Sequence, residues 1–387
     1  MIQYLTPVSK SVVAHREILP NGVLGKQINI YQNEAHWPDL KGVKFVLLGV
    51  REHRNDVDYM GGSLDFDAVR KSFYGLYPGN WPLSLVDLGD IVPGHDVEDT
   101  YFALKTVVAA LLQQGIIPII LGGSQDLLYA HYRAFDQTTT MLNLVNIDHR
   151  FDLGDAQAPI SNKSFVGRII VDEPYNLFNY SVLGFQSYLN PPEEIALMDK
   201  LHFDAYRLGV LTNDLSLAEP ILRNASLVAL DVSCIKSGDL SVKYHKSPNG
   251  FDSREICAMA RYTGISNRVK SFGLYELKSF DQSESGANLI AQILWYFIEG
   301  VSFRVADEDF QNDRDFTTYS VPIDDLVLVF KKSNKTGRWW VVLPFNSKTD
   351  NNTHKHALLP CTYDEYIGAT NQEMPERWLK ARLKNEV

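Results

Sequence analysis

The sequence predicts an α/β fold built on a mainly parallel sheet with helices on both faces. Two observations carry this prediction. Short apolar segments rich in β-branched residues recur along the chain, which is typical of buried strands. Segments with helical apolar spacing separate them, and right-handed crossovers place such helices on the faces of a parallel sheet. The predicted strands are 43–50, 84–92, 116–123, 141–148, 225–233 and 269–277, and the predicted helices are 65–77, 98–115, 131–136 and 287–301.

The pattern changes beyond the last of these helices, so we expect an α/β domain over 1–302 and a C-terminal extension over 303–387. In the extension, the apolar segments 324–330 and 338–345 flank a polar turn and predict a β-hairpin. A short amphipathic helix is expected to end the chain.

The extension is rich in aromatic side chains. Trp339 and Trp340 are adjacent on a predicted strand and should face opposite ways, so at least one of them could be exposed. Together with Trp378 they are candidates for an interface with another protein, because tryptophan is enriched at interface hot spots. Packing of the extension against its own domain is the alternative, and the sequence is also compatible with a homo-oligomer.

Composition restricts the classes of partner. The 387 residues carry a formal net charge of −10, which argues against a nucleic-acid binder, because such a protein needs a basic surface. Three cysteines are too few for a disulfide framework, which favours a reducing compartment. No apolar run reaches the length of a membrane span, and residues 1–20 do not resemble a signal peptide. We therefore expect a cytoplasmic protein.

Polar residues gather at the ends of four predicted strands, where parallel sheets bind their ligands. The four segments are LGGSQD (121–126), NIDHRFD (146–152), ALDVS (229–233) and GLYELKS (273–279). In order and spacing they resemble the signatures of the arginase, agmatinase and formimidoylglutamase (ureohydrolase) family, which are GGDH, DAHxD, DxDxxDP and a later strand-end glutamate. With VDLGD (86–90) and NGFDSREI (249–256), the resemblance covers about residues 40–302. It implies a three-layer arginase-like fold.

The resemblance also implies a site for two Mn²⁺ ions, which activate a water molecule for attack on a guanidino or formimino carbon. Asp148 and Asp152 match the two aspartates of DAHxD, and Asp231 matches the first aspartate of DxD. Glu276 matches the glutamate that faces the cationic group of the substrate.

Three positions depart from the family pattern. Gln125 replaces the histidine of GGDH, Arg150 replaces the histidine of DAHxD, and Ser233 replaces the second aspartate of DxD. A guanidinium cannot coordinate a cation, so the ion that would have used Arg150 and Ser233 is expected to be absent. The amide oxygen of Gln125 could still ligate a cation. These three residues and Glu276 are our candidates for the lining of a ligand pocket.

Alternation along an extended strand would project Asp148, Arg150 and Asp152 to one side and His149 to the other. Two arrangements then remain open. In the first, which we favour, Arg150 forms salt bridges with the carboxylates and no cofactor is bound. In the second, Asp148, Asp152 and Asp231 hold at most a single cation such as Mn²⁺, Mg²⁺ or Ca²⁺.

Two functional hypotheses follow. The favoured one is a non-catalytic ureohydrolase-fold protein that acts as a binding, scaffold or regulatory component, because Gln125, Arg150 and Ser233 remove metal ligands. The alternative is a metal-dependent hydrolase of the formimidoylglutamase or agmatinase type that acts on a linear amidine C–N bond. Glu276 would be a catalytic residue only under this alternative.

Overall fold

The computed structural model describes residues 1–59, 61, 64–82, 84–138, 140–240, 247–280, 285–307, 313–343 and 358–386. Its main feature is a nine-stranded sheet in the order β1-β3-β2-β4-β9-β8-β5-β6-β7, in which every pairing is parallel. These strands are β1 (Asn29–Ile30), β2 (Phe45–Val50), β3 (Leu85–Ile91), β4 (Ile117–Gly122), β5 (Leu142–Ile147), β6 (Leu177–Phe185), β7 (Asp204–Arg207), β8 (Leu227–Asp231) and β9 (Ser271–Tyr275).

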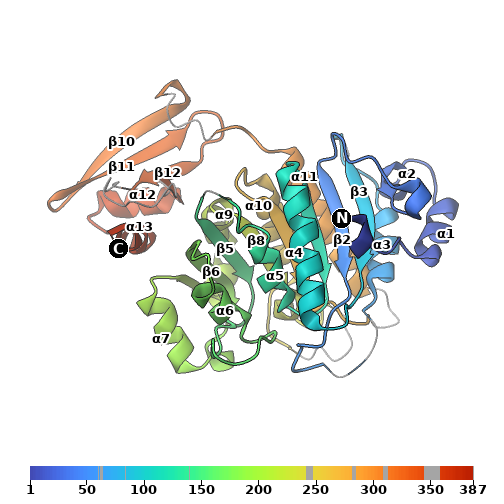
Figure 1. Ribbon diagram of the computed structural model, residues 1–387. Helices are drawn as coiled ribbons and strands as arrows, with labels where there is room; N and C mark the ends of the chain where they lie inside the picture. Colours follow the sequence, from blue (N-terminus) through green and yellow to red (C-terminus); the bar gives the residue numbers. More distant parts are fainter. Residues whose placement is uncertain are drawn as a thin grey trace.

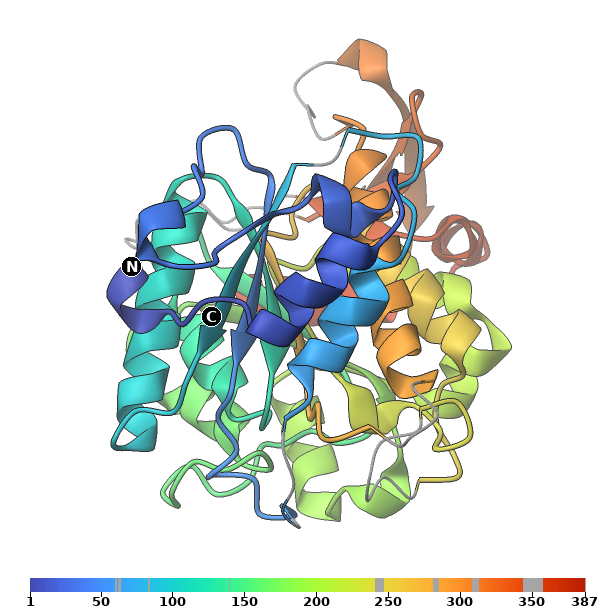
Figure 2. The same cartoon turned by 90° about the vertical axis from the view of Figure 1, so that its right-hand side faces the viewer.

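Helices cover both faces of this sheet (Figures 1 and 2). The helices of the main domain are α1 (Lys10–Ile18), α2 (Leu24–Gln27), α3 (Phe66–Tyr74), α4 (Val97–Gln113), α5 (Leu127–Arg133), α6 (Phe165–Val171), α7 (Pro192–Lys200), α8 (Leu208–Asn213), α9 (Ala218–Arg223), α10 (Ser253–Ile265) and α11 (Ser285–Ser302). Strand β2 shows the alternation that makes two cores. Phe45 and Leu47 pack with α3, α10 and α11, whereas Val46 and Leu48 pack with α4 and α5. The predicted α/β class is therefore confirmed.

Strands β6 and β7 were missed by sequence reasoning because polar residues interrupt their apolar pattern. Asn179 and Ser181 lie on β6, and both side chains donate to Oδ2 of Asp204 on β7, at 2.8 and 3.4 Å. All three side chains are buried. A buried polar group is tolerated where it is hydrogen-bonded. This segment can therefore form a buried strand although its sequence is not a continuous apolar run.

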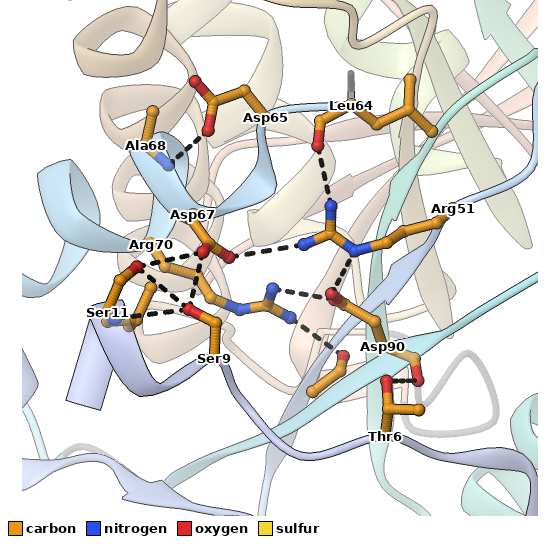
Figure 3. A network of polar contacts seen from close by, with 12 residues as sticks. Thr6, Ser9, Ser11, Arg51, Leu64, Asp65, Asp67, Ala68, Arg70 and Asp90 are labelled. Atoms are coloured by element: carbon orange, nitrogen blue, oxygen red, sulfur yellow. Dashed lines mark hydrogen bonds and ion pairs between the residues drawn. The ribbon is translucent and has the colours of Figure 1, made fainter.

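A buried ion network fastens α3 and the N-terminal segment to β3 (Figure 3). The Arg70 guanidinium is fully buried and pairs with Asp87 and Asp90, each at 2.8 Å. On its other carboxylate oxygen Asp90 pairs with Arg51 at 2.6 Å, and Arg51 reaches Asp67 of α3 at 3.3 Å. Because each buried carboxylate faces at least one guanidinium, the network compensates its own charges.

The C-terminal extension forms a separate antiparallel sheet in the order β10-β11-β12-β13. Its elements are β10 (Phe316–Ile323), β11 (Leu326–Ser333), β12 (Trp339–Val342), β13 (Leu358–Cys361), α12 (Tyr363–Thr370) and α13 (Glu376–Glu386). The predicted hairpin corresponds to β11 and β12, which pair antiparallel, and the predicted final helix corresponds to α13. None of the helices in the described ranges is long and apolar enough to cross a membrane.

The extension packs on the main domain beside β5 and β6 (Figure 1). Arg223 of α9 lies under the ring of Trp340, with its Cζ 4.4 Å from the ring centroid, and donates to the carbonyl oxygen of Cys361. Lys384 of α13 reaches the side chain of Asn179 on β6 and lies over Phe178. Burial lowers the pKa of Lys384 to about 8.

The three tryptophans expected at a protein interface are buried within the chain. Trp339 and Trp340 do face opposite ways, but Trp339 enters the core of the extension, where Trp378 also lies, and Trp340 packs against Phe316. None of the three is more than 7% exposed. No exposed tryptophan is therefore found among the three, because helices of the extension cover one side of β12 and α9 of the main domain packs against Trp340 on the other.

We expect Arg70→Met to lower the free energy of unfolding by about 3–5 kcal/mol, because it leaves the buried carboxylate of Asp87 without a guanidinium partner and leaves Asp90 with Arg51 alone. Urea denaturation measures this change. The matched control is Arg168→Met, which removes a half-exposed pair with Asp172 and should cost less than about 1 kcal/mol. Equal costs for the two variants would contradict the importance of the buried network.

We expect Trp340→Ala to destabilise the extension by about 3–5 kcal/mol, since a fully buried indole leaves a cavity and Arg223 loses its ring contact. Limited proteolysis with mass spectrometry should then find cleavage within 303–387 before cleavage in the main domain. The control Val327→Ala alters a side chain that is 62% exposed and should leave the cleavage rate near that of the unmodified chain.

Candidate metal centre

The four polar clusters meet at one edge of the sheet. Strands β4, β9, β8 and β5 are consecutive neighbours, and their carboxyl ends lie together because all of their pairings are parallel. The clusters follow these strand ends directly, with Asp148 one residue after β5 and Glu276 one residue after β9. The strand order thus brings the four polar clusters together at the carboxyl ends of the strands.

Asp148 is held by three hydrogen bonds. Its Oδ2 accepts from Nε2 of Gln125 and from Nδ2 of Asn146, both at 2.8 Å, and its Oδ1 accepts from the backbone N–H of Arg150 at 2.9 Å. Nε2 of Gln125 also donates to Oδ1 of Asn146 at 3.1 Å. The Gln125 amide therefore turns its nitrogen, and not its oxygen, toward Asp148. It acts here as a hydrogen-bond donor to the carboxylate and not as the oxygen ligand that the sequence allowed.

Asp148, His149 and Asp231 form a group that could hold a metal ion. One potential ligand atom from each residue lies within 4.8 Å of the others. Nδ1 of His149 lies 3.5 Å from Oδ1 of Asp148 and 3.4 Å from Oγ of Ser233. The expectation that His149 faces away was wrong, because β5 ends at Ile147 and strand alternation ends with it.

Three buried carboxyl groups crowd this region. Burial raises the pKa of Asp148, and burial together with the charge of Asp148 raises the pKa of Asp231 to about 6. The pKa of Asp152 is raised well above its ordinary value by burial and by the charges of Asp148 and Asp231. Oδ2 of Asp152 is buried and has no hydrogen-bond partner in the described parts of the chain. A cation would relieve this repulsion.

Arg150 compensates these carboxyl groups only from a distance, since its positive charge opposes the rise in the pKa of Asp152 without an ion pair. Its backbone N–H binds Asp148, but no ion pair of its guanidinium occurs within the described residues. Asp152 has a φ of 51°, so the chain turns sharply after the strand instead of continuing extended. The predicted common projection nevertheless holds for the carboxyl groups of Asp148 and Asp152, which act on each other, but the predicted salt bridges of Arg150 do not form among the described residues.

Glu276 occupies the other end of the site. Its Oε1 accepts from the backbone N–H of Gln125 at 2.9 Å and from Nδ2 of Asn162 at 3.3 Å, and its Oε2 pairs with Lys278 at 3.1 Å. Lys278 also pairs with Asp56 at 2.9 Å. Burial and the charge of Asp231 raise the pKa of Glu276 to about 8, an effect that Lys278 opposes.

Sequence reasoning missed several residues of the site. His149, Asn162 and Lys278 contact residues that it had identified, and Asp56 contacts Asn162 and Lys278. Lys278 had a usable signal, since it lies two residues after Glu276 in a strand-end cluster. Asp56 and Asn162 lie in loops distant from that cluster in sequence and are brought to it only by the fold. Ser233, which was identified, donates its backbone N–H to Oδ1 of Asp231 at 2.7 Å.

Comparison with known proteins agrees with this strand-end geometry. The model of the arginase family matches residues 43–299. The chain belongs to the arginase family.

Two curated relatives of this arginase-family chain are both formimidoylglutamases. The one from Streptococcus gordonii is 24% identical over 294 residues, which are 69% of this chain and 87% of the relative. The one from Geobacillus thermodenitrificans is 33% identical over 132 residues, which are 32% of this chain and 40% of the relative.

Solved structures with the same fold include formiminoglutamase from Trypanosoma cruzi with Mn²⁺. Its TM-score is 0.63 at 16% identity, and the match covers 70% of this chain and 97% of that one. For formimidoylglutamase from Bacillus subtilis the TM-score is 0.61 at 17% identity, covering 69% and 90%. These likenesses confirm the predicted arginase-like fold.

In protein stripped of metal by EDTA, we expect Asp231→Asn to raise the free energy of unfolding at pH 7 by about 1–3 kcal/mol. The folded pKa of Asp231, about 6, lies above its ordinary value of 3.8, so ionisation weakens the fold as pH rises between these values. The gain should vanish below about pH 4, where both states are protonated. Urea denaturation at several pH values measures it.

The control for this prediction is Asp199→Asn, which changes an exposed aspartate of α7 and should shift stability by less than about 0.5 kcal/mol. Addition of Mn²⁺ should stabilise the unmodified chain and stabilise Asp231→Asn much less. A variant that is no more stable than the unmodified chain in EDTA would show that the carboxyl group is not under electrostatic strain.

Proposed function

We propose that the chain is a metal-dependent hydrolase of the formimidoylglutamase type, which uses one divalent cation to hydrolyse a C–N bond of a linear amidine. The observation that carries the proposal is the group formed by Asp148, His149 and Asp231 at the ends of β5 and β8. Of the two hypotheses drawn from the sequence, this group and the names of the relatives favour the hydrolase.

The residues fit a cation on two grounds. Asp148, Asp152 and Asp231 are buried with raised pKa values, and one oxygen of Asp152 lacks a partner among the described residues. A cation at this position would stabilise the ionised carboxylates. Two carboxylates and an imidazole also form a mixed oxygen and nitrogen ligand set, which suits Mn²⁺ or Zn²⁺ better than Ca²⁺. Three protein ligands leave coordination positions for water and substrate.

A bound ion of this kind supplies Lewis acidity and lowers the pKa of water. The residues of the chain do the positioning. Gln125 and Asn146 orient Asp148 from one side, while Ser233 fixes one oxygen of Asp231. An amidine is cationic at neutral pH, so a negatively charged Glu276 can pair with its N–H groups. Burial raises the pKa of Glu276, Lys278 lowers it, and a cation that offsets the charge of Asp231 would lower it further and so favour the charged carboxylate.

In the proposed reaction, the oxygen of water adds to the amidine carbon and one C–N bond breaks. The departing nitrogen takes a proton and leaves as an amine or as ammonia, and the carbon keeps the oxygen as an amide. Water is the only co-reactant, and no oxidant or reductant is required.

A non-catalytic binding protein is the second candidate, and one observation favours it. Gln125 turns its N–H groups toward Asp148, while Arg150 and Ser233 stand where the family pattern has two further ligands. The second Mn²⁺ of the family therefore lacks protein ligands here. Under this candidate the site formed by Asp148, Asp231 and Glu276 would bind an amidine or an amine without cleaving it.

The deciding experiment combines elemental analysis with an activity assay. After loading with Mn²⁺ and desalting, we expect one ion per chain, and N-formimidoyl-glutamate should be hydrolysed with release of free glutamate or ammonia. Asp148→Asn should lower both the metal content and the rate, the rate by about 100-fold or more, because a ligand is lost. The control is Asp155→Asn, a nearby exposed aspartate outside the metal group, which should keep both.

The outcomes separate the two candidates. Absence of metal together with absence of hydrolysis would contradict the hydrolase and leave the binding protein. Two tightly held ions per chain would contradict the single-ion site but retain the hydrolase. Activity that is unchanged in Asp148→Asn would place the chemistry elsewhere in the molecule.

A further inference from the structure

Lys278 pairs with two buried carboxylates near the carboxyl end of β9. Its Nζ lies 3.1 Å from Oε2 of Glu276 and 2.9 Å from Oδ2 of Asp56. Nδ2 of Asn162 joins the other oxygens of the same two groups, since it donates to Oδ1 of Asp56 at 3.0 Å and to Oε1 of Glu276 at 3.3 Å. The four side chains therefore form a closed group of contacts.

This group contains more negative than positive charge. One ammonium ion faces two carboxylates, and the Asn162 amide is neutral, so the group carries one negative charge when both carboxyl groups are ionised. The pKa of Glu276 is raised by burial first, then by the charge of Asp231 and to a smaller extent by that of Asp56, while Lys278 lowers it. One further cation would make the group neutral.

Of the three charged side chains, Lys278 is the one that can move. It is 22% exposed, against 7% for Glu276 and 1% for Asp56, and lysine carries its ammonium ion on a flexible four-carbon stem. The two carboxylates are instead held by backbone groups. The N–H of Gln125 donates to Oε1 of Glu276, and the N–H of Asp58 donates to Oδ1 of Asp56, both at 2.9 Å.

Lys278 also occupies the open side of Glu276. A carboxylate oxygen accepts about two hydrogen bonds. Oε1 of Glu276 already has two donors, the backbone N–H of Gln125 and Nδ2 of Asn162, whereas the contact of Oε2 among the described residues is Lys278. A cationic ligand that binds Glu276 must therefore bind Oε2, where it competes with Lys278.

We propose that Lys278 controls the access of the amidine to Glu276. In the free chain the Lys278 ammonium ion closes Oε2 of Glu276, and the amidine replaces it there while Asp56 retains the ammonium ion. Each carboxylate then has a cation of its own, and the group becomes neutral. The inference rests on the proposed function, because that function assigns the amidine to Glu276.

Calorimetric titration of the full chain with acetamidine, in the presence of Mn²⁺, measures binding without requiring turnover. Binding at Glu276 is the part of the affinity that Glu276→Gln removes, so a chain that hydrolyses nothing still tests the role of Lys278. We expect Lys278→Met to bind acetamidine about tenfold or more tightly than the unmodified chain, because the competing cation is gone. Lys278→Arg keeps a cation and should stay within about threefold of the unmodified chain.

The control is Lys10→Met, which removes the same charge from an exposed position of α1 and should leave the affinity within about twofold. Unchanged or weaker binding by Lys278→Met would overturn the proposal. Absence of binding at Glu276 in both the unmodified chain and Lys278→Met, at about 50 mM acetamidine, would overturn it as well.

Asp56→Asn tests the same exchange without removing Lys278, and it decides the question if thermal unfolding shows that Lys278→Met does not fold. Lys278 then pairs with Glu276 alone, so acetamidine should bind about tenfold more weakly. In the double variant with Lys278→Met, the Asp56→Asn change should cost less than about threefold, because no ammonium ion is left for Asp56 to retain. An equal cost with and without Lys278 would show that Asp56 acts on the ligand itself and would overturn the exchange.

Discussion

The electrostatic strain among Asp148, Asp152 and Asp231 is the constraint on which the functional edge of this sheet depends. Three carboxyl groups are buried within reach of one another, and the raised pKa values of all three record the cost of charging them together. The contrast with the ion network around Arg70 is instructive, because there every buried carboxylate has a guanidinium partner. The fold neutralises one acidic cluster by direct ion pairs and leaves the other only partly compensated, which supports the cation proposed for the second cluster.

The parallel sheet explains why the candidate site lies at the ends of the strands. Along the strands, apolar side chains alternate into two cores, and the polar exceptions, such as Asp87 of β3 and Asn179 of β6, are paired within the protein. At the carboxyl ends the chain turns into loops that carry Asp148, Asp231 and Glu276. At the amino ends, Lys44 precedes β2 and Lys270 precedes β9, and both line a cavity there. One architecture thus separates an acidic edge from a basic edge.

The sequence was sufficient for the class of fold and for the strand-end residues that begin each cluster, because strand periodicity and motif order are local properties. Asp231 is the last residue of β8 and Asp148 is the first residue after β5, so their positions could be predicted from the strands. His149, Arg150 and Asp152 could not be placed in the same way, since they follow the end of β5 and the positive φ of Asp152 redirects the chain. The burial of Trp340 against Arg223 could not be predicted from the sequence either, because the two residues lie 117 positions apart and meet only in the folded chain.

The docking of α13 has a consequence for the solubility of the chain. Strand β7 is the last strand of the nine-stranded sheet, and an uncovered last strand can pair with a strand of another molecule. Lys384 lies over Phe178 and Phe203 beside this end of the sheet, and Arg377 acts electrostatically on Tyr206 of β7. Loss of the C-terminal helix would uncover these aromatic side chains next to an edge strand. The extension therefore keeps aromatic side chains beside the edge strand β7 away from solvent.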